Sequence, residues 1–211
     1  MIFKQIRSGG DRNFSYLVSS QDKQAACVID PSPDPGKVIE VIKAEGIIVG
    51  YLINTHLHYD HSGGNDAIKK EYEKNGLFTV NTSREDLATD GMTISLKEVS
   101  LKIIKTPGHT SDSICVLAGN RLITGDTLFV GKIGGTYSRH DAEEEFNSLK
   151  KLTDLPPSTE VWPGHDYGEK PSSTIKYEIE NNPFLKRLGD FKDFLWLKQN
   201  WAAYKIEHGI A

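Results

Sequence analysis

The sequence predicts an α+β fold, a sandwich of two β-sheets whose outer faces are covered by helices. Short apolar runs typical of strands dominate the first third of the chain and return after residue 78, while helical patterns are few. The strict alternation of strand and helix that builds a doubly wound parallel sheet is missing. Hydrophobic residues make up 37% and charged residues 26% of the 211 residues, a balance typical of a folded chain long enough to close a core.

The predicted strands are short apolar runs bounded by turn residues. Cys27 and Cys115 lie inside two of these runs, so we expect two reduced thiols buried in the core rather than a disulfide. In chain order the predicted strands cover residues 2–6, 14–19, 25–30, 51–54, 78–81, 92–96, 99–105, 114–117, 121–124 and 160–162.

The predicted helices lie between and after these strands. Residues 34–45 have apolar side chains at helical spacing and end before Gly46, and residues 65–75 end before Gly76. Asp141 followed by Glu144 resembles a capping box, which predicts a helix from Asp141 to about residue 152. The tail from residue 172 onward also has a helical pattern.

No repeat, low-complexity tract or linker marks a domain boundary. We expect residues 1–171 to form one domain and residues 172–211 to form a short helical C-terminal extension packed on it. The extension carries an apolar face that predicts packing on the sandwich or on a dimer partner, with a lid over a pocket as the alternative. This face consists of Phe191, Phe194, Leu195, Leu197, Trp201 and Tyr204.

The strongest functional signal is the segment INTHLHYDHSGG at residues 53–64. Here His56, His58, Asp60 and His61 follow the end of a predicted strand within six positions. A strand end gives these side chains a rigid base, and imidazole and carboxylate ligands suit Zn²⁺, Fe or Mn better than Ca²⁺ or Mg²⁺. A solvated polar loop is the alternative, but three of the seven histidines of the chain lie in this segment. We therefore predict a metal site.

Three further residues stand in the same context, after an apolar strand and beside glycine or proline: His109 in KTPGHTSDS, Asp126 in LITGDTLF and His165 in VWPGHDYG. Each alone fits a turn residue satisfied by backbone hydrogen bonds. Together with the first cluster they give seven candidate ligands, which are too many for one four-coordinate ion and suit two ions that share a carboxylate. The residues therefore predict two divalent metal ions, Zn²⁺ with Fe or Mn as alternatives.

Four neighbours of these loops are candidates to hydrogen-bond the imidazoles from behind, with strand-end capping as the alternative role. They are Asp30, Asn54, Thr55 and Thr110.

The motif THLHYDH resembles the HxHxDH signature of the metallo-β-lactamase superfamily, and the three later candidates follow in that family's order. More narrowly, TPGHTSDSICV, LITGDTLFVG and PGHDYG resemble the glyoxalase II branch, which hydrolyses glutathione thioesters, and its persulfide dioxygenase relatives. The resemblance implies a four-layer αββα sandwich with two metal sites. It assigns one metal to His56, His58 and His109, the other to Asp60, His61 and His165, and the bridging position to Asp126.

We therefore expect a metallohydrolase that uses a metal-bound hydroxide on a small thioester such as a hydroxyacylglutathione, with Asp60 and Asp126 as catalytic residues. A thiolate leaving group needs little acid assistance, because thiols have a pKa near ~8.5. If only one metal binds, Asp60 is the candidate base that orients the water. The alternative is a persulfide dioxygenase with a mononuclear Fe(II) centre held by His56, His109 and Asp126.

The substrate contacts are predicted from the loop GKIGGTYSRHD. Glyoxalase II enzymes usually carry a basic residue in this loop, and the matching position here is Gly135. Lys132 and Arg139 are the candidates to supply the charge instead. Tyr167 matches a tyrosine that follows the last histidine in both relatives, so it is a candidate substrate contact with plain packing as the alternative. The tail is shorter than the helical region that contributes glutathione contacts in glyoxalase II.

The net charge of −4 and the absence of a basic cluster argue against nucleic-acid or anionic-membrane partners, and so against a nuclease of the same superfamily. No apolar stretch approaches the length of a spanning helix, and the N-terminus lacks a signal-peptide run. We expect a cytoplasmic enzyme with a small-molecule substrate and leave a homodimer open. A non-catalytic binding module is disfavoured by the complete ligand set.

Overall fold

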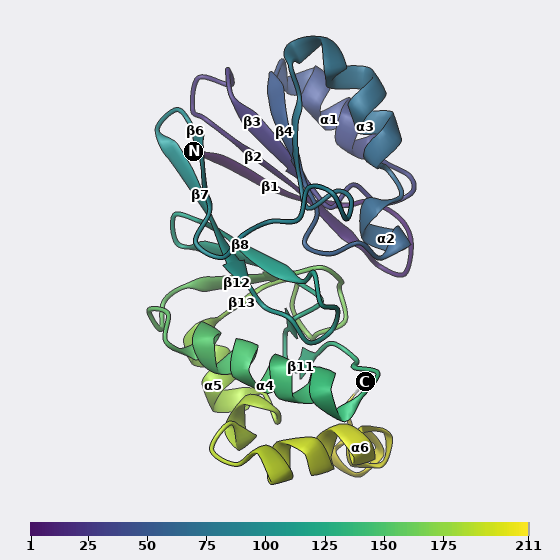
Figure 1. Cartoon of the computed structure of the whole chain (residues 1–211), viewed down its shortest axis with the longest axis vertical. Helices are drawn as coiled ribbons and strands as arrows, with labels where there is room; N and C mark the ends of the chain where they lie inside the picture. The colour runs from purple at the N-terminus through teal and green to yellow at the C-terminus, as the bar shows by residue number, and fades with distance from the viewer. Residues whose placement is uncertain (211) are drawn as a thin grey trace.

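Two β-sheets pack face to face at the centre of the molecule, with helices on both outer sides (Figure 1). This computed structural model describes residues 1–210. The first sheet has the order β1-β2-β3-β4-β5, with antiparallel pairs from β1 to β3 and parallel pairs from β3 to β5. Its strands are β1 (Ile2–Arg7), β2 (Phe14–Ser19), β3 (Ala26–Ile29), β4 (Val49–Ile53) and β5 (Phe78–Val80).

The second sheet has the order β13-β12-β9-β8-β7-β6. Its pairs are antiparallel except for β12 and β9, which run parallel. A two-stranded hairpin, β10 (Leu128–Phe129) with β11 (Lys132–Ile133), follows β9. The six strands are β6 (Thr93–Leu96), β7 (Val99–Lys105), β8 (Ile114–Ala118), β9 (Arg121–Gly125), β12 (Glu160–Pro163) and β13 (Ser173–Thr174).

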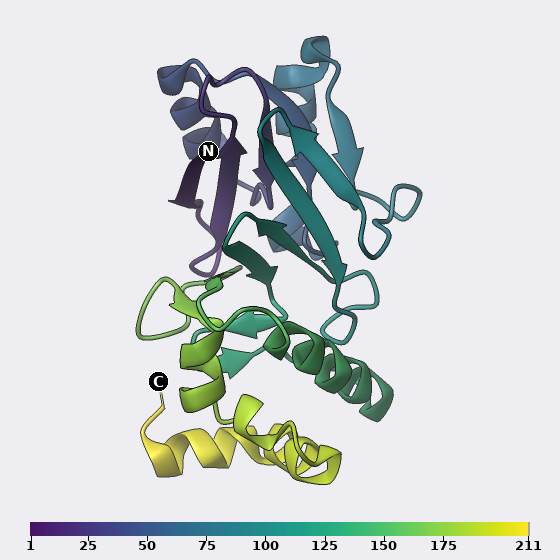
Figure 2. The same cartoon turned by 90° about the vertical axis from the view of Figure 1, so that its left-hand side faces the viewer.

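The helices cover the two outer faces, so the predicted four layers are present. Those on the first sheet are α1 (Gly36–Glu45) and α3 (Asn65–Tyr72), which η1 (Glu73–Asn75) prolongs, and α2 (Tyr59–Ser62) forms one turn beside them. Those on the second sheet are α4 (Arg139–Thr153), α5 (Ile175–Asn181), η2 (Leu185–Arg187) and α6 (Phe191–His208). Figure 2 shows α4 and α6 stacked at the far side of the second sheet.

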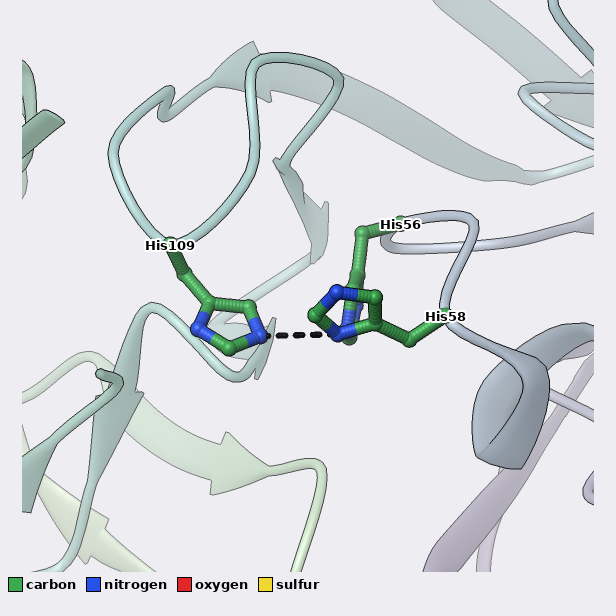
Figure 3. Close-up of side chains that lie close together, drawn as sticks. All are labelled: His56, His58 and His109. Carbon is green, nitrogen blue, oxygen red and sulfur yellow. Dashed lines mark hydrogen bonds between the residues drawn. The ribbon is translucent and has the colours of Figure 1, made fainter. Parts of the chain in front are cut away.

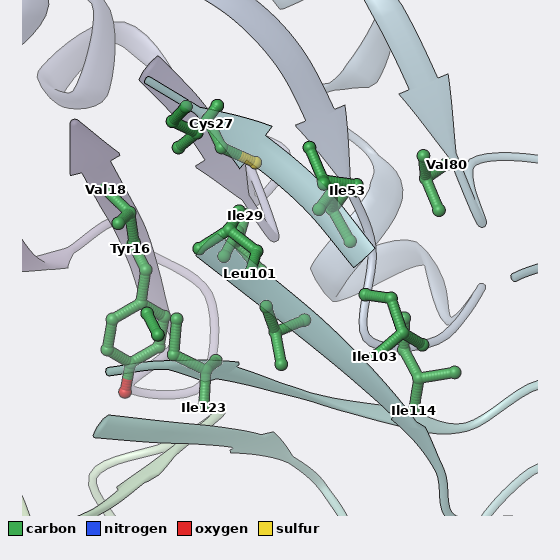
Figure 4. Close-up of a cluster of buried hydrophobic side chains, with 14 of the residues drawn as sticks. Tyr16, Val18, Cys27, Ile29, Ile53, Val80, Leu101, Ile103, Ile114 and Ile123 are labelled. Atoms are coloured by element: carbon green, nitrogen blue, oxygen red, sulfur yellow. The ribbon is translucent and has the colours of Figure 1, made fainter. Parts of the chain in front are cut away.

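Three apolar clusters separate these layers. In β2, Tyr16 and Val18 face the second sheet while Leu17 faces α1 and α3, because successive side chains of a strand point to opposite faces. The cluster between the sheets is drawn in Figure 4 and includes Ile29 and Ile103. Cys27 lies in it and Cys115 lies in the cluster under α4 and α6, and both are buried free thiols, as predicted.

The start of α4 differs from the prediction. The helix begins at Arg139, and the Ser138 hydroxyl accepts a hydrogen bond from the backbone N–H of Asp141 at 3.1 Å. Ser138 is therefore the N-cap and Asp141 lies inside the first turn, where its carboxylate is favourable beside the helix N-terminus. The predicted cap was wrong because Ser138 and Asp141 form the same kind of motif three residues earlier in the chain.

The C-terminal extension packs on the rest of the chain through α6. Phe194 and Leu197 are fully buried, in contact with a cluster that contains Phe146 and Phe184, and rings of Phe146 and Phe194 lie 5.3 Å apart. Leu195 faces a different way and lines a cleft beside Asp126. The helix therefore packs on the sandwich and also borders a cavity. Within residues 1–210, no helix has both the length and the apolar character that crossing a membrane requires.

Candidate metal centre

The seven predicted ligands lie on segments that follow four strand ends at one edge of the sandwich. His56 and His58 follow β4, and Asp60 and His61 lie in the turn of α2. The other three follow β7, β9 and β12, which run in the same direction within the second sheet, so their carboxyl ends share an edge: His109, Asp126 and His165. Across the two sheets, the backbone N–H of Ile114 donates to the Thr55 carbonyl at 2.8 Å. The structure brings all seven side chains together.

The first group consists of His56, His58 and His109 (Figure 3). Nδ1 of His58 lies 3.0 Å from Nε2 of His56 and 3.0 Å from Nε2 of His109. A hydrogen bond joins the loop of His56 and His58 to the loop of His109: the backbone N–H of Leu57 donates to the Asp112 carboxylate at 2.8 Å. Three ring nitrogens therefore converge on one point.

The second group consists of Asp60, His61 and His165. The two Nε2 atoms of His61 and His165 are 3.1 Å apart, and Oδ2 of Asp60 lies 3.2 Å from Nε2 of His165 and 3.6 Å from Nε2 of His61. Two nitrogens and one carboxylate oxygen thus face a common point beside the first group.

Asp126 lies between the two groups. Its Oδ1 is 3.2 Å from Nε2 of His61 and 3.4 Å from Nε2 of His165, while its Oδ2 is 3.7 Å from Nε2 of His109. One oxygen faces the second group and the other faces the first. This is the arrangement that a carboxylate shared by two ions requires.

The donor set fits a pair of cations. Among residues 1–210, Oδ1 of Asp126 is buried and has no hydrogen-bond partner, although an unpaired buried carboxylate oxygen is costly. Contacts between ring nitrogens near 3 Å place lone pairs against each other unless protons or cations lie between them. Imidazole and carboxylate donors of this kind bind Zn²⁺, Fe and Mn.

Several imidazoles are oriented by a group that accepts a hydrogen bond from Nδ1, the ring nitrogen that faces away from the donor groups. The Asp30 carboxylate accepts from His61 at 3.0 Å, and the Thr55 hydroxyl lies 3.2 Å from Nδ1 of His56. Of the four residues predicted for this role, these two contact an imidazole. Asn54 instead donates to the backbone carbonyl of His61 at 2.9 Å, and the Thr110 hydroxyl lies 2.7 Å from that of Ser113.

Two further acceptors for Nδ1 atoms are backbone carbonyls, which the sequence analysis did not predict. Nδ1 of His165 donates to the Asp11 carbonyl at 2.8 Å, and Nδ1 of His109 donates to the Gly135 carbonyl at 2.8 Å. Gly135, singled out as a substrate position, therefore also orients a predicted ligand. A carbonyl contact across 26 or 154 residues leaves no pattern in the sequence, since every residue has a carbonyl.

Asn13 is a further residue of the site that was missed. Its side-chain amide donates to Oδ2 of Asp60 at 3.1 Å and to the Asp60 backbone carbonyl at 3.2 Å. It is almost fully buried and pairs with His165 in an isolated β-bridge. The only signal in the sequence is a polar residue directly before an apolar strand, which is also typical of ordinary turns.

Burial and neighbouring charged groups shift the pKa values of the site residues in opposite directions. Hydrogen bonding to His165 holds the pKa of Asp60 well below its usual value, so this carboxylate is ionised and a weak base. Burial alone would raise the pKa of Asp126, but the facing His61 and His165 hold it well below its usual value. Burial lowers the pKa of His56, whereas the carboxylates around His165 outweigh its burial and raise its pKa to about 9. The two ionised carboxylates supply the negative charge that attracts a cation to this site.

A cleft of about 1340 Å³ opens beside Asp126, between the β10–β11 hairpin, the loop that follows it and α6. Lys132, Arg139 and Tyr167 all line it. Lys132 donates to the Tyr167 carbonyl at 2.8 Å, and burial lowers the pKa of its ammonium group. The Tyr167 ring stacks on His165 with centroids 4.5 Å apart. All three predicted substrate contacts thus line the cleft, and their contact with substrate stays a prediction.

Comparisons with known proteins agree with this architecture. The sequence profile of the metallo-beta-lactamase superfamily matches residues 8–77 and 76–165. A hydroxyacylglutathione hydrolase of Pelagibacter ubique is 34% identical over 186 residues, which cover 82% of this chain and 75% of that protein. BaeB of Bacillus velezensis, a probable zinc-dependent hydrolase of polyketide biosynthesis, is 27% identical over 184 residues and 82% of each chain.

Among solved structures, ETHE1 from Myxococcus xanthus superposes with a TM-score of 0.84 at 27% identity, over 95% of this chain and 91% of that one. The predicted sandwich and the resemblance read from the HxHxDH motif are confirmed by the profile match and by these relatives. This chain belongs to the metallo-β-lactamase superfamily.

Proposed function

We propose that this protein is a metal-dependent hydrolase that cleaves a thioester of the hydroxyacylglutathione class in the cleft beside Asp126. The observation that carries this proposal is the position of Asp126, whose two oxygens face two separate groups of imidazole and carboxylate donors. The 34% identical relative named hydroxyacylglutathione hydrolase and the relative named zinc-dependent hydrolase support it.

The donors divide into two sites of three ligands each, with Asp126 common to both. In the proposal, one ion is held by His56, His58 and His109, and the other by Asp60, His61 and His165. Zn²⁺ is the ion that this donor set suits first, with Fe or Mn as alternatives. When bound, two such ions lower the pKa of a water molecule toward neutrality and polarise the acyl carbonyl.

The residues of the chain supply the remaining requirements of the reaction. Asn13 holds the Asp60 carboxylate in place, and the low pKa of Asp60 makes it a ligand in preference to a proton acceptor. A thiol leaves as thiolate near its pKa of ~8.5, so the reaction needs no strong general acid from the protein. Asp126 contributes negative charge at the point where both donor groups meet.

The cleft is large enough for an acyl group and an extended thiol carrier, since small-molecule sites commonly span roughly 300 to 1,000 Å³. Lys132 and Arg139 line it, but Gly135 occupies the position where glyoxalase II enzymes usually carry a cation, so in this proposal the carboxylates of a glutathione moiety bind weakly. In the proposal Tyr167 contacts the acyl end, and the stacking of its ring on His165 supports this role. Residues 172–211 form one functional unit with residues 1–171 in this proposal, because α6 provides one wall of the cleft.

The test is a paired assay on the purified protein. Zn²⁺-loaded protein should release thiol from a hydroxyacylglutathione thioester, and Asp126→Asn should abolish that release, while Asp166→Asn, which changes a surface carboxylate paired with Arg7, should not. Thioester cleavage that is equal in the wild type and in Asp126→Asn would contradict the proposal.

A second candidate function is that of a persulfide dioxygenase, and one observation favours it. ETHE1 from Myxococcus xanthus covers 95% of this chain at a TM-score of 0.84, and the segments around His109, Asp126 and His165 resemble persulfide dioxygenases as well as glyoxalase II. That reaction uses one Fe(II) with two histidines and a carboxylate, and His56, His109 and Asp126 provide such a set within the same centre. An oxygen electrode distinguishes the two candidates, because only the dioxygenase consumes O₂ with glutathione persulfide.

A further inference from the structure

We propose that Lys198 of α6 is a positioning residue for His109 and couples the C-terminal helix to the metal centre. The inference rests on the proposed function, in which His109 is a metal ligand. It goes beyond that proposal because it assigns a role to a side chain that lies outside the segment matched by the family profile, residues 8–165.

Lys198 is an almost buried ammonium group with two acceptors. Its side chain is 9% exposed, its Nζ donates to the Gly134 carbonyl at 3.0 Å, and it forms an ion pair with Glu145 of α4, whose side chain is fully buried. The rings of Phe184 and Phe194 surround it, at 6.0 and 5.8 Å from Nζ. A charge in such surroundings is held in one place, because moving it away from its partners is costly.

The first of these contacts leads to His109 through the loop after β11. Gly134 precedes Gly135, whose carbonyl accepts the Nδ1–H of His109 at 2.8 Å. The backbone at Gly134 is packed so closely that an added Cβ would lie 2.1 Å from the Asp126 carbonyl and 3.0 Å from Nδ1 of His109. A shift of the Gly134 carbonyl therefore moves the acceptor that orients His109.

The second contact leads to the same histidine from its own loop. An added Cβ at Gly108, the residue before His109, would lie 2.5 Å from Cα of Glu145. One turn further along α4, the Ser148 hydroxyl donates to the Pro107 carbonyl at 2.7 Å. Oε1 of Glu145 is buried and has no hydrogen-bond partner in the part of the chain that the structure describes, so Lys198 anchors this carboxylate through Oε2. One segment beside His109 therefore contacts Lys198 directly, and the other packs on α4 at Glu145, the partner of Lys198.

The chemical consequence concerns the tautomer and direction of one imidazole. Donation from Nδ1 to a fixed carbonyl leaves the lone pair on Nε2, which is the atom that points at the first donor group. Loss of such an outer partner typically lowers metal affinity or activity about 10- to 100-fold.

The test uses Lys198→Met combined with Glu145→Gln, which keeps the shape of the pair and leaves no unpaired buried charge. Lys198→Arg is the rescue variant, and Lys192→Met is the control, since it removes an exposed lysine of the same helix. The first readout needs no metal: nitrogen-15 labelled histidines report the Nδ1-bound proton of His109 by NMR. The second is a chelator competition that measures the affinity of each Zn²⁺ site.

We expect the double variant to be folded, with faster exchange of the His109 Nδ1 proton. One Zn²⁺ should bind about 10- to 100-fold more weakly while the other is unchanged. The kcat should fall with little change in KM, and Lys198→Arg should recover most of these properties.

Three results would overturn the inference. The first is a double variant whose His109 proton signal and both metal affinities match the wild type. The second is an equal loss at both sites that follows global unfolding, and the third is a rise in KM alone.

The variant His109→Ala separates a failure of this inference from a failure of the proposed function. If His109→Ala loses one Zn²⁺ while the double variant behaves as wild type, only the role of Lys198 is wrong. If His109→Ala keeps both, the metal centre and this inference fall together.

Discussion

The Asp30 carboxylate accepts a hydrogen bond from Nδ1 of His61 at 3.0 Å, and both side chains are fully buried. Its other contacts are also with donors: the backbone N–H and the hydroxyl of Thr55, each at 2.6 Å. A carboxylate can accept from all three of these donors, whereas an amide would place its NH₂ group against one of them. The connection explains how strand β3 contributes to the metal centre although it carries no proposed ligand.

Asp30→Asn should therefore weaken the metal site that contains His61. Either orientation of the amide places its NH₂ group against a donor, so His61 loses its fixed acceptor or Thr55 is displaced. We expect about a 10- to 100-fold loss of affinity at one of the two sites, measured by chelator competition. Asp34→Asn, on an exposed position of the same loop, is the control. Equal affinities in Asp30→Asn and wild type would show that the contact does not orient the ligand.

Gly134 and Gly135 should respond in opposite ways to the same substitution. An added Cβ at Gly134 would meet the Asp126 carbonyl at 2.1 Å, whereas at Gly135 it meets nothing within 4 Å. Gly134→Ala must therefore displace backbone beside a proposed ligand, and we expect lower metal content and activity. Gly135→Ala should keep both. Metal analysis and thioester turnover of the two variants check this, and similar losses in both would mean that the loop has another constraint.

Gly135→Lys should lower the KM for glutathione thioesters. A charge-assisted hydrogen bond to a carboxylate contributes ~1.5 to 3 kcal/mol, which corresponds to roughly a 10- to 100-fold change in binding. The wild type should have a high KM and little preference for glutathione over a smaller thiol that carries the same acyl group. Gly135→Met, of similar length without charge, is the control. Tight, glutathione-dependent turnover by the wild type would show that Lys132 or Arg139 already supplies the charge.

Phe194→Ala should destabilise the whole molecule, because this ring is fully buried against Phe146 and Phe184. A buried phenylalanine replaced by alanine typically costs about 3 to 5 kcal/mol of unfolding free energy. Trp196→Ala, on the same helix but 51% exposed, should cost much less. Denaturant unfolding of both variants gives the comparison. A small effect of Phe194→Ala would indicate that α6 is a detachable lid over the cleft.

The sequence predicts the layers of the fold and the proposed ligands because both depend on local patterns. The alternation Tyr16, Leu17, Val18 determines which side chain enters which cluster. His56, His58, Asp60 and His61 are close in space because they are close in the chain.

The missed parts depend on contacts between distant segments. The carbonyls of Asp11 and Gly135 and the amide of Asn13 meet the histidines or Asp60 only when both sheets and their loops are assembled. The hairpin strands β10 and β11 have two residues each, which is too short for a periodic pattern. The pair Glu145–Lys198 joins residues 53 apart, with no motif at either position.

The most direct test of the metal centre is element-specific metal analysis of wild type and Asp126→Asn, purified without added metal. Because one oxygen of Asp126 faces each donor group, we expect two metal ions per wild-type chain and a loss of metal from both sites in Asp126→Asn. Thioester hydrolysis should vanish with chelation and return with Zn²⁺. A single ion per wild-type chain, or two ions retained by Asp126→Asn, would contradict the shared carboxylate and with it the two-metal hydrolase.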